Sequence, residues 1–398
     1  MMGTLSRRTF LGTGLAGLSA MAASGHVVAQ TESLSDLGAS LMASPTATVF
    51  TARDIVTLDP AKPSAQAVAV VNGRILSVGT MEEVTAILGN QPYTFDRTFS
   101  DHVIVPGFVA QHDHPVLAAL TMSSEILSIE DWVLPGRTVP AVKDKKDFME
   151  RLGQAVKASP DSDATLLTWG YHPAFYGSLT KAELDKISTT RPIIVWGRSC
   201  HEMFFNSRTM ERAGITDAVF ESFSASAKKQ SDMGKGHFWE QGMFAVLPRI
   251  ASFAASPQRL QAGLELSRDY MHAKGITIGN EPGGILAKPV QDGVNAVFSS
   301  PDMPFRWSFM VDGKTMVAKY ADDQQVIEES EKLASWYGGM TSLAPKQAKL
   351  FADGAIYSQL MRCASRSSMA KGEWMMDETF QRGFRIYWTR LPDPHPRQ

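Results

Sequence analysis

The sequence predicts an α/β protein whose main domain contains a parallel sheet. Two observations carry this prediction. From residue 257 onward, segments with helical spacing alternate with short apolar runs of strand length, as in a parallel sheet covered by helices. Polar residues follow these runs, so we expect the carboxyl ends of the strands to carry the chemistry. A small β-layer is expected before this domain, over residues 46–102.

Composition limits the class of protein. The chain has 398 residues, of which 44% are hydrophobic and 20% are charged, as in ordinary globular proteins. Its formal net charge of -2 argues against a nucleic-acid partner. The two cysteines, Cys200 and Cys363, are too few for a zinc ribbon or an iron–sulfur cluster, and whether they pair with each other stays open.

Residues 1–29 have the pattern of an export signal. Residues 6–12 read Ser-Arg-Arg-Thr-Phe-Leu-Gly, which is similar to the twin-arginine signature, and a weakly apolar run and a small-residue cleavage pattern follow. We therefore expect the twin-arginine export machinery as a partner and a periplasmic location. The run is too short and too rich in glycine to span a bilayer stably, and we expect no other transmembrane segment. A disordered basic N-terminus is the alternative.

After a linker over residues 30–45, the β-layer is predicted from alternation and turn chemistry. Its expected elements are a strand over 46–58, a hairpin over 65–79, a helix over 81–88 and a strand over 93–102. Asn72-Gly73 at the tip of the hairpin supplies the two positive φ angles that a type I′ turn requires.

Residues 103–115 end in two histidines one residue apart, in the order Val-Ile-Val-Pro-Gly-Phe-Val-Ala-Gln-His-Asp-His-Pro. In a strand, alternate side chains share a face, so His112 and His114 should point the same way. Two neutral imidazoles so placed can hold one divalent cation. Pro115 should end the strand. A pair of hydrogen-bonded structural histidines is the alternative interpretation.

The remainder of the chain supplies the other helices and strands. The expected elements are helices over 143–158, 257–274 and 323–337, and strands over 165–169, 192–196, 275–280 and 304–311. Glu281 directly follows one of these strands and is a candidate metal ligand. Residues 349–354 read Lys-Leu-Phe-Ala-Asp-Gly, where strand alternation puts Lys349 and Asp353 on one face.

Several features occur together in a characteristic order. They are the hairpin residues Gly73-Arg74-Ile75 and Val78-Gly79, the short helix after them, Val105-Pro106-Gly107-Phe108, and His112-x-His114. From about Thr46 to about Trp388 the chain resembles the amidohydrolase superfamily of metal-dependent hydrolases, in the branch that includes N-substituted formamide deformylase. The resemblance implies a partial (β/α)8 TIM-like barrel over residues 103–388, an N-terminal β-sandwich half over 46–102, and an inserted α/β subdomain over about 118–255.

The resemblance also implies a reaction. It is the hydrolysis of a carbon–nitrogen bond in a small, non-peptide amide or formamide-like substrate by a metal-activated water. The cofactor would be a divalent metal, with zinc expected, bound by His112 and His114 and by Lys349 or Glu281. If Lys349 is carboxylated by carbon dioxide, the carbamate would bridge a binuclear centre. An ordinary surface lysine at this position is the alternative.

For substrate binding, the resemblance points to His201, Asn206 and Glu240 in the inserted subdomain, and to Asp353 near the metal. His201 and Asn206 lie on a segment that resembles the family's His…Asn-Ser motif, and Glu240 occupies the position of an acidic loop residue. From the residues alone, a structural histidine is the alternative for His201, and a solvated loop charge is the alternative for Glu240.

The sequence departs from the family's pattern at two places. Gln111 stands where the family often has an acidic residue. The contact by which that acid would support the metal ligands is therefore in doubt, whereas the ligands themselves are not. Residues 389–398 form an aberrant proline-rich tail, and the family's later ligand histidines and its strand-8 catalytic aspartate are not found, so the catalytic residue is unknown. We therefore expect a C-terminally truncated chain, with a natural short variant as the alternative. The competing functional hypothesis is a catalytically inactive fragment that only binds metal or has a structural role.

Overall fold

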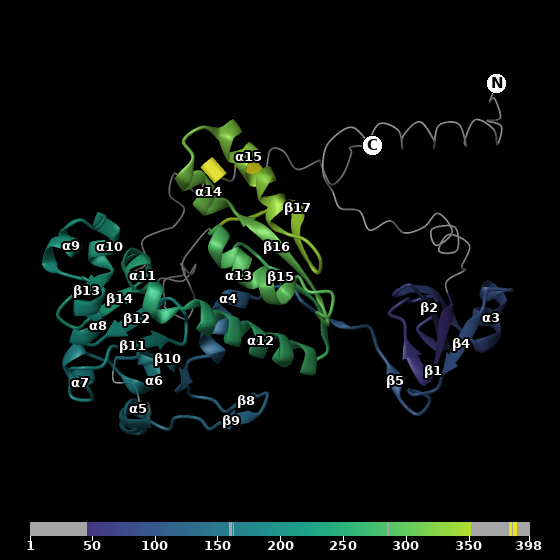
Figure 1. Cartoon of the computed structure of the whole chain (residues 1–398), viewed down its shortest axis with the longest axis horizontal. Coiled ribbons are helices and arrows are strands. Elements are labelled where there is room, and N and C mark those ends of the chain that lie inside the picture. Colours follow the sequence, from purple (N-terminus) through teal and green to yellow (C-terminus); the bar gives the residue numbers. More distant parts are fainter. Residues whose placement is uncertain are drawn as a thin grey trace, which may run out of the picture. The chain divides into compact units, whose positions relative to one another are not determined.

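The computed structural model describes most of the chain, which divides into two compact units (Figure 1). The boundary along the chain lies between Pro106 and Gly107. The described residues are 46–158, 161, 163–284, 286–351, 382–383 and 385–387. The expected export signal, linker and proline-rich tail lie outside them, as do Asp353 and Cys363. In the described part of the chain, no helix is long and apolar enough to cross a membrane.

The first unit is a five-stranded sheet with one helix. Its strands follow the order β3-β2-β1-β4, and β5 also pairs with β1. The elements are β1 (Ala47–Val56), β2 (Ser64–Val71), β3 (Arg74–Gly79), α3 (Met81–Leu88), β4 (Tyr93–Asp96) and β5 (Val103–Ile104). The predicted hairpin is confirmed, because β2 and β3 pair antiparallel and Asn72 and Gly73 have φ angles of 50° and 71°.

The helix of this unit begins where its capping chemistry predicts. The side chain of Thr80 accepts a hydrogen bond from the main-chain N–H of Glu83, whose carboxylate in turn accepts from the N–H of Thr80. This capping box satisfies two N–H groups that the first turn would otherwise leave unpaired. Val84 and Leu88 then pack on the sheet residues Ala67 and Ala69.

The segment before the paired histidines contains two short strands. Val103–Ile104 pairs with β1 in the first unit, whereas β6 (Phe108–Ala110) belongs to a sheet of the second unit. Pro106 lies between them and has no N–H to offer to a sheet ladder. The strand expected to carry both histidines thus begins after Pro106 but ends at Ala110, before it reaches them, so the prediction that they lie on a strand was wrong.

The second unit contains the predicted parallel sheet. Its order is β17-β16-β15-β6, and each neighbouring pair is parallel. The remaining strands are β15 (Ile276–Glu281), β16 (Arg306–Asp312) and β17 (Thr341–Lys349). The last strand begins at Thr341, earlier than the apolar pattern indicated, and carries an irregularity near Lys346, which has a φ of 56°.

Helices between these strands cover the sheet. They are α4 (Pro115–Met122), α12 (Pro257–Ala273), α13 (Lys288–Phe298), α14 (Gly313–Lys319) and α15 (Asp323–Lys332). The predicted helix over 323–337 changes to the short 3-10 helix η1 (Leu333–Trp336) for its last turn. Helices α4 and α12 approach so closely that a Cβ on Gly263 would lie 2.1 Å from the main-chain oxygen of Ala119. Glycine is therefore required there for steric reasons.

The predicted insertion over about residues 118–255 forms an α/β subdomain around a mixed sheet. The strand order of this sheet is β13-β14-β12-β11-β10-β7. Its strands are β7 (Glu125–Ile126), β10 (Leu166–Tyr171), β11 (Ile193–Gly197), β12 (Glu202–Phe205), β13 (Ser231–Asp232) and β14 (His237–Trp239). The small hairpin β8 (Trp132–Leu134) and β9 (Arg137–Val139) stands apart from this sheet.

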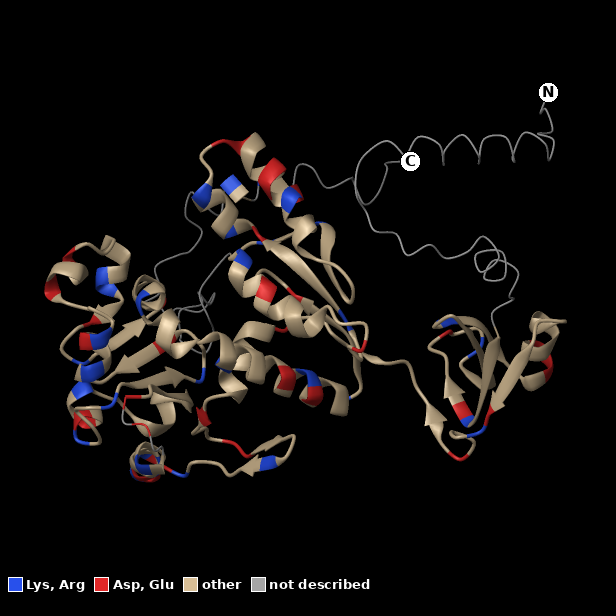
Figure 2. Cartoon of the chain, viewed as in Figure 1, with Lys and Arg blue, Asp and Glu red and all other residues tan. Residues whose placement is uncertain are grey.

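Helices pack on both faces of this mixed sheet and bury two apolar clusters. They are α5 (Lys145–Ala158), α6 (Pro173–Tyr176), α7 (Lys181–Asp185), α8 (Ser207–Arg212), α9 (Asp217–Glu221), α10 (Ala225–Lys229) and α11 (Gln241–Ala254). We refer to this part as the inserted subdomain. Acidic and basic residues both occur on the helices of the second unit, whereas α3 of the first unit carries only acidic ones (Figure 2). The predicted α/β class is confirmed, and the described strands do not form a closed barrel.

Candidate functional site

Polar side chains gather at the carboxyl edge of the four-stranded parallel sheet. Strand β6 leads into His112 and His114, and Glu281, Asp312 and Lys349 are the last residues of the three strands beside it. Because parallel strands all end at the same edge, residues far apart in the sequence meet there. The sequence predicted four of these five residues as site residues.

The two histidine rings face each other across a short gap. Their Nε2 atoms are 3.3 Å apart, and the ring planes are nearly perpendicular, at 85°. Strand alternation is not the cause, because β6 ends at Ala110 and His114 is the N-cap of α4. The rings are instead aimed by a bend between strand and helix, in which Pro115 occupies the first helical position.

Asn280 fixes this bend from the neighbouring strand. Its side-chain amide donates to the main-chain oxygen of Gln111 at 3.0 Å, and its own main-chain oxygen accepts from the N–H of Asp113 at 3.0 Å. The bend thus has hydrogen bonds on both sides of His112. Asn280 gave no signal in the sequence, since its role depends on the pairing of β15 with β6.

A buried carboxylate orients one of the two histidines. Nδ1 of His114 lies 2.5 Å from Oε1 of Glu281, whose side chain is only 3% exposed. With the proton on Nδ1 donated to this carboxylate, Nε2 keeps its lone pair and faces His112. Such carboxylate–histidine pairs set the tautomer and direction of metal-binding imidazoles. Glu281 thus contacts the nitrogen of His114 that points away from His112.

The geometry of the pair fits two ligands of one cation. Two nitrogens bound to zinc at about 2.0–2.1 Å in a tetrahedral site are about 3.3–3.4 Å apart, and Nε2 of His112 is 3.3 Å from Nε2 of His114. Within the described ranges, no group of three or more His, Cys, Asp or Glu side chains is placed to hold a metal. The described residues therefore provide two matched imidazoles, with Lys349 nearby.

Burial shifts the pKa values of three side chains at this site. Burial, followed by the charges of Lys349 and His114, lowers the pKa of His112, which favours its neutral, metal-binding form. Burial raises the pKa of Glu281, while the hydrogen bond from His114 opposes that rise. Burial likewise raises the pKa of Asp113 to about 6, against the effect of His114.

Lys349 ends β17 beside these residues. Its ammonium lies 5.2 Å from the ring centre of Phe351, within cation–π distance. Gly283, with a φ of 85°, passes directly over Lys349, and a Cβ on this glycine would lie 2.6 Å from the lysine Cβ. The turn after β15 therefore requires glycine next to Lys349. Asp312 is less available, because both of its oxygens accept hydrogen bonds from Thr315.

We compared the chain with known proteins. No family model matches it. Among curated proteins, it is 24% identical to Protein LONG AFTER FAR-RED 3 of Arabidopsis thaliana over 226 residues, which is 56% of this chain and 36% of that protein. It is 27% identical to N-substituted formamide deformylase of Arthrobacter pascens over 169 residues, covering 41% of this chain and 28% of that protein. The matches span about a third of the length of these curated relatives.

Among solved structures, the chain resembles an uncharacterized metal-dependent hydrolase from Pyrococcus horikoshii. The TM-score is 0.57 at 12% sequence identity, and the match covers 86% of this chain and 63% of that one. The chain therefore shares the fold of this metal-dependent hydrolase. In an open parallel sheet of this kind, ligands usually bind beyond the carboxyl ends of the strands, which is the edge that carries His112 and His114.

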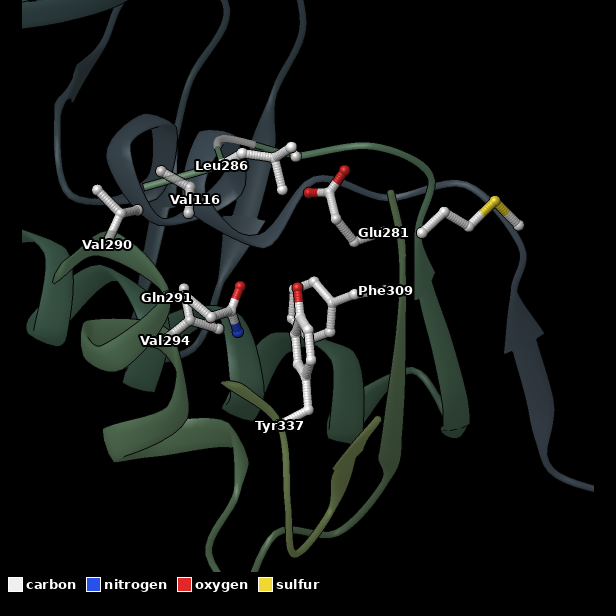
Figure 3. Close-up of a pocket in the computed structure, with 10 residues that line it drawn as sticks. Val116, Glu281, Leu286, Val290, Gln291, Val294, Phe309 and Tyr337 are labelled. Atoms are coloured by element: carbon white, nitrogen blue, oxygen red, sulfur yellow. The ribbon is translucent and has the colours of Figure 1, made fainter. Parts of the chain in front are cut away.

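A small pocket lies beneath this edge of the sheet (Figure 3). Apolar side chains of α4, α13 and β16 form most of its wall, and Glu281, Gln291 and Tyr337 supply its polar groups. The ring of Tyr337 packs on Phe309, with ring centres 5.0 Å apart, and its hydroxyl points toward the side that Glu281 lines (Figure 3). Burial, with the charge of Glu281, raises the pKa of Tyr337 to about 12, so this tyrosine remains protonated.

The three substrate-binding residues predicted in the inserted subdomain have different surroundings. Asn206 is fully buried, and its side chain makes hydrogen bonds with main-chain groups of residues 188, 191, 193 and 209 and with the hydroxyl of Thr209. These bonds fill its capacity and cap α8, so they give it a structural role. His201 and Glu240 instead lie together, with Nδ1 and Oε1 2.9 Å apart.

Proposed function

We propose that this protein is a metal-dependent hydrolase that cleaves a carbon–nitrogen bond in a small amide or formamide-like molecule. The observation that carries the proposal is the facing pair His112 and His114, with Nε2 atoms 3.3 Å apart and His114 held by the buried Glu281. The hydrolase fold supports the reaction type. The likeness to a protein named N-substituted formamide deformylase supports the bond.

The metal would be held by His112 and His114, with Lys349 as a candidate further ligand if it is carboxylated. Imidazole donors suit zinc, which is our expected metal. When bound, such a cation polarises the scissile carbonyl and lowers the pKa of water to about 7. A second metal would depend on the carbamate of Lys349, because the described residues offer no other cluster of ligands.

The protein's own groups prepare the site. Glu281 accepts the Nδ1 proton of His114 and so directs the lone pair of Nε2 toward His112. The burial of His112, together with the charge of Lys349 while that lysine is not carboxylated, favours the neutral form of the imidazole. Asn280 holds the bend between the two histidines rigid. The ligands are therefore positioned before any metal binds, which lowers the entropic cost of binding.

We further propose that the four-stranded sheet is part of a (β/α)8 barrel. Its strands β6, β15, β16 and β17 lie side by side in the order of the sequence, all parallel, with helices between them. The twin-arginine pattern of residues 6–12 supports export to the periplasm by the twin-arginine machinery, with zinc acquired before export.

Metal analysis and hydrolysis assays test the proposal. The purified chain is analysed for bound metals and incubated with a panel of N-alkyl formamides and acetamides, with formate, acetate and amine as measured products. We expect about one or two equivalents of zinc and steady turnover. His112→Ala and His114→Ala should each abolish both, whereas His102→Ala, an exposed histidine of the first unit, should change neither.

The outcomes separate the competing hypotheses. Folded protein that holds zinc through His112 and His114 but turns over no amide supports a metal-binding protein without catalysis. Protein that binds no metal at all, or whose metal content is unchanged by both substitutions, contradicts the proposed site.

A further inference from the structure

A second pair of titratable side chains lies in the inserted subdomain, away from the paired histidines. His201 precedes β12 and Glu240 follows β14, and these two strands pair antiparallel with Glu202 opposite Trp239. The next register position therefore brings His201 and Glu240 together, and the main-chain N–H of Glu240 donates to the main-chain oxygen of His201 at 2.9 Å.

The carboxylate of Glu240 is buried without adequate partners. The residue is 3% exposed, and neither oxygen makes a hydrogen bond with any described group. Its Oε1 approaches Nδ1 of His201 to 2.9 Å, but that contact lacks the angles of a hydrogen bond. Burying a carboxylate without hydrogen bonds destabilises the folded protein unless a hydrogen-bond donor or a cation binds to it.

The main chain at Glu240 is strained. Its φ of 42° and ψ of -116° lie outside the regions that non-glycine residues normally adopt. Glu240 is also the N-cap of α11, yet its side chain makes no capping hydrogen bond. A strained backbone thus aims an unpartnered carboxylate at something other than its own helix, and strain of this kind clusters at ligand-binding sites.

Access and surroundings favour an organic amine. The side chain of His201 is 32% exposed, so the buried Glu240 lies directly behind a group that meets solvent. One helical turn after Glu240, Phe244 is 45% exposed and offers an apolar surface. The ring of Phe244 is 5.9 Å from the ammonium of Lys314, two residues after the end of β16, so this turn of α11 lies near the carboxyl edge of the parallel sheet.

We propose that His201 and Glu240 form a subsite that binds the ammonium group of a small organic amine, with Phe244 beside its carbon chain. An ammonium has three donors and no acceptor, which suits a carboxylate whose oxygens accept no hydrogen bond from the described residues, with an imidazole nitrogen beside it. A metal ion is less suited, because no third His, Cys, Asp or Glu joins this pair in the described part of the chain.

This subsite would select substrates whose nitrogen-bearing part carries a second amine. That assignment rests on the proposed function, whereas the binding of ammonium does not.

Calorimetric titration of the full chain with n-butylammonium chloride tests the binding, with n-butanol as the uncharged comparison. Glu240→Gln should weaken n-butylammonium binding by about ten- to a hundred-fold and leave n-butanol unaffected. The matched control is Glu202→Gln. Glu202 belongs to another histidine–carboxylate pair of the same sheet, but it already makes a 2.9 Å hydrogen bond with His237. This control should bind n-butylammonium as the wild type does.

A second variant distinguishes the loss of binding from a loss of folding. Glu240→Gly removes the carboxylate and permits the positive φ, so its melting temperature should equal or exceed that of the wild type while n-butylammonium binding is lost. Wild-type protein that binds n-butanol as tightly as n-butylammonium, or that binds neither, overturns the proposal. So does retained binding in either Glu240 variant.

Hydrolysis assays on the same samples keep the two proposals apart. N-(2-aminoethyl)formamide and N-propylformamide have similar size but differ in the second amine. A preference for the first that disappears in Glu240→Gln supports the subsite's role in substrate selection. Binding of n-butylammonium without hydrolysis of any amide contradicts only the proposed function. Hydrolysis without n-butylammonium binding contradicts only the subsite.

Discussion

Replacing Glu281 by Gln should weaken metal binding without unfolding the protein. The carboxylate is 3% exposed and lies 2.5 Å from Nδ1 of His114, so it determines which nitrogen of that ring carries the proton. Gln can present its NH2 group instead, which makes Nδ1 an acceptor and moves the proton to Nε2, the atom that faces His112. The shape of the site is retained while one of its two lone pairs is lost.

The expected magnitude follows from this geometry. Loss of a supporting carboxylate typically costs about 10–100-fold in metal affinity, which corresponds to about 1.4–2.7 kcal/mol at one site. The free energy of unfolding should change less than the free energy of metal binding. Burial raises the pKa of Glu281, which shows that its charged form is disfavoured there, and Gln removes that charge. We expect the melting temperature of the metal-free variant to stay within a few degrees of the wild-type value.

Competition titration with a chromogenic zinc chelator measures this affinity at pH 7. Glu202→Gln serves as the control, since its carboxylate contacts His237 in the inserted subdomain and should not affect zinc. Zinc affinity of Glu281→Gln equal to that of the wild type would refute the reasoning, as it would show that the contact with His114 does not prepare Nε2. A loss of equal size in Glu202→Gln would indicate a general effect on folding.

Four further predictions concern stability. Gly263→Ala should destabilise the protein by about 1–3 kcal/mol in chemical denaturation, because its Cβ would meet main-chain oxygen at 2.1 Å. Gly153→Ala, a helical glycine whose Cβ would have no neighbour closer than 3.7 Å, should instead stabilise it by about 0.5–1 kcal/mol. Asn206→Ala should lower stability by about 2 kcal/mol or more, since it leaves several buried main-chain groups unpaired; an unchanged denaturation midpoint would contradict this. The hydrogen bond from Arg198 lowers the pKa of Glu130 from its ordinary value of 4.5, so the stability from this pair is present above pH 4.5 and lost as the pH falls below it. Melting temperatures recorded between neutral and acidic pH should therefore fall more steeply for the wild type than for Glu130→Gln.

Local sequence determined much of the fold and the main site. Asn72-Gly73 specified the hairpin, because few other dipeptides adopt two positive φ angles. The alternation of helical and apolar segments specified the parallel sheet, because strands joined by helices return in the same direction. The histidine pair was visible because its two members are neighbours in the sequence. These features depend on contacts or periodicities that span only a few residues.

Tertiary structure alone decided the other features. The contact between His114 and Glu281 joins residues 167 positions apart, and it exists only because β6 and β15 pair side by side. The meeting of His201 with Glu240 depends on the register of β12 and β14. Pairing partners and register are set by the burial of whole faces of a sheet, which involves distant segments at once. Local patterns therefore show which residues can do chemistry, whereas the packing of the sheets decides which of them meet.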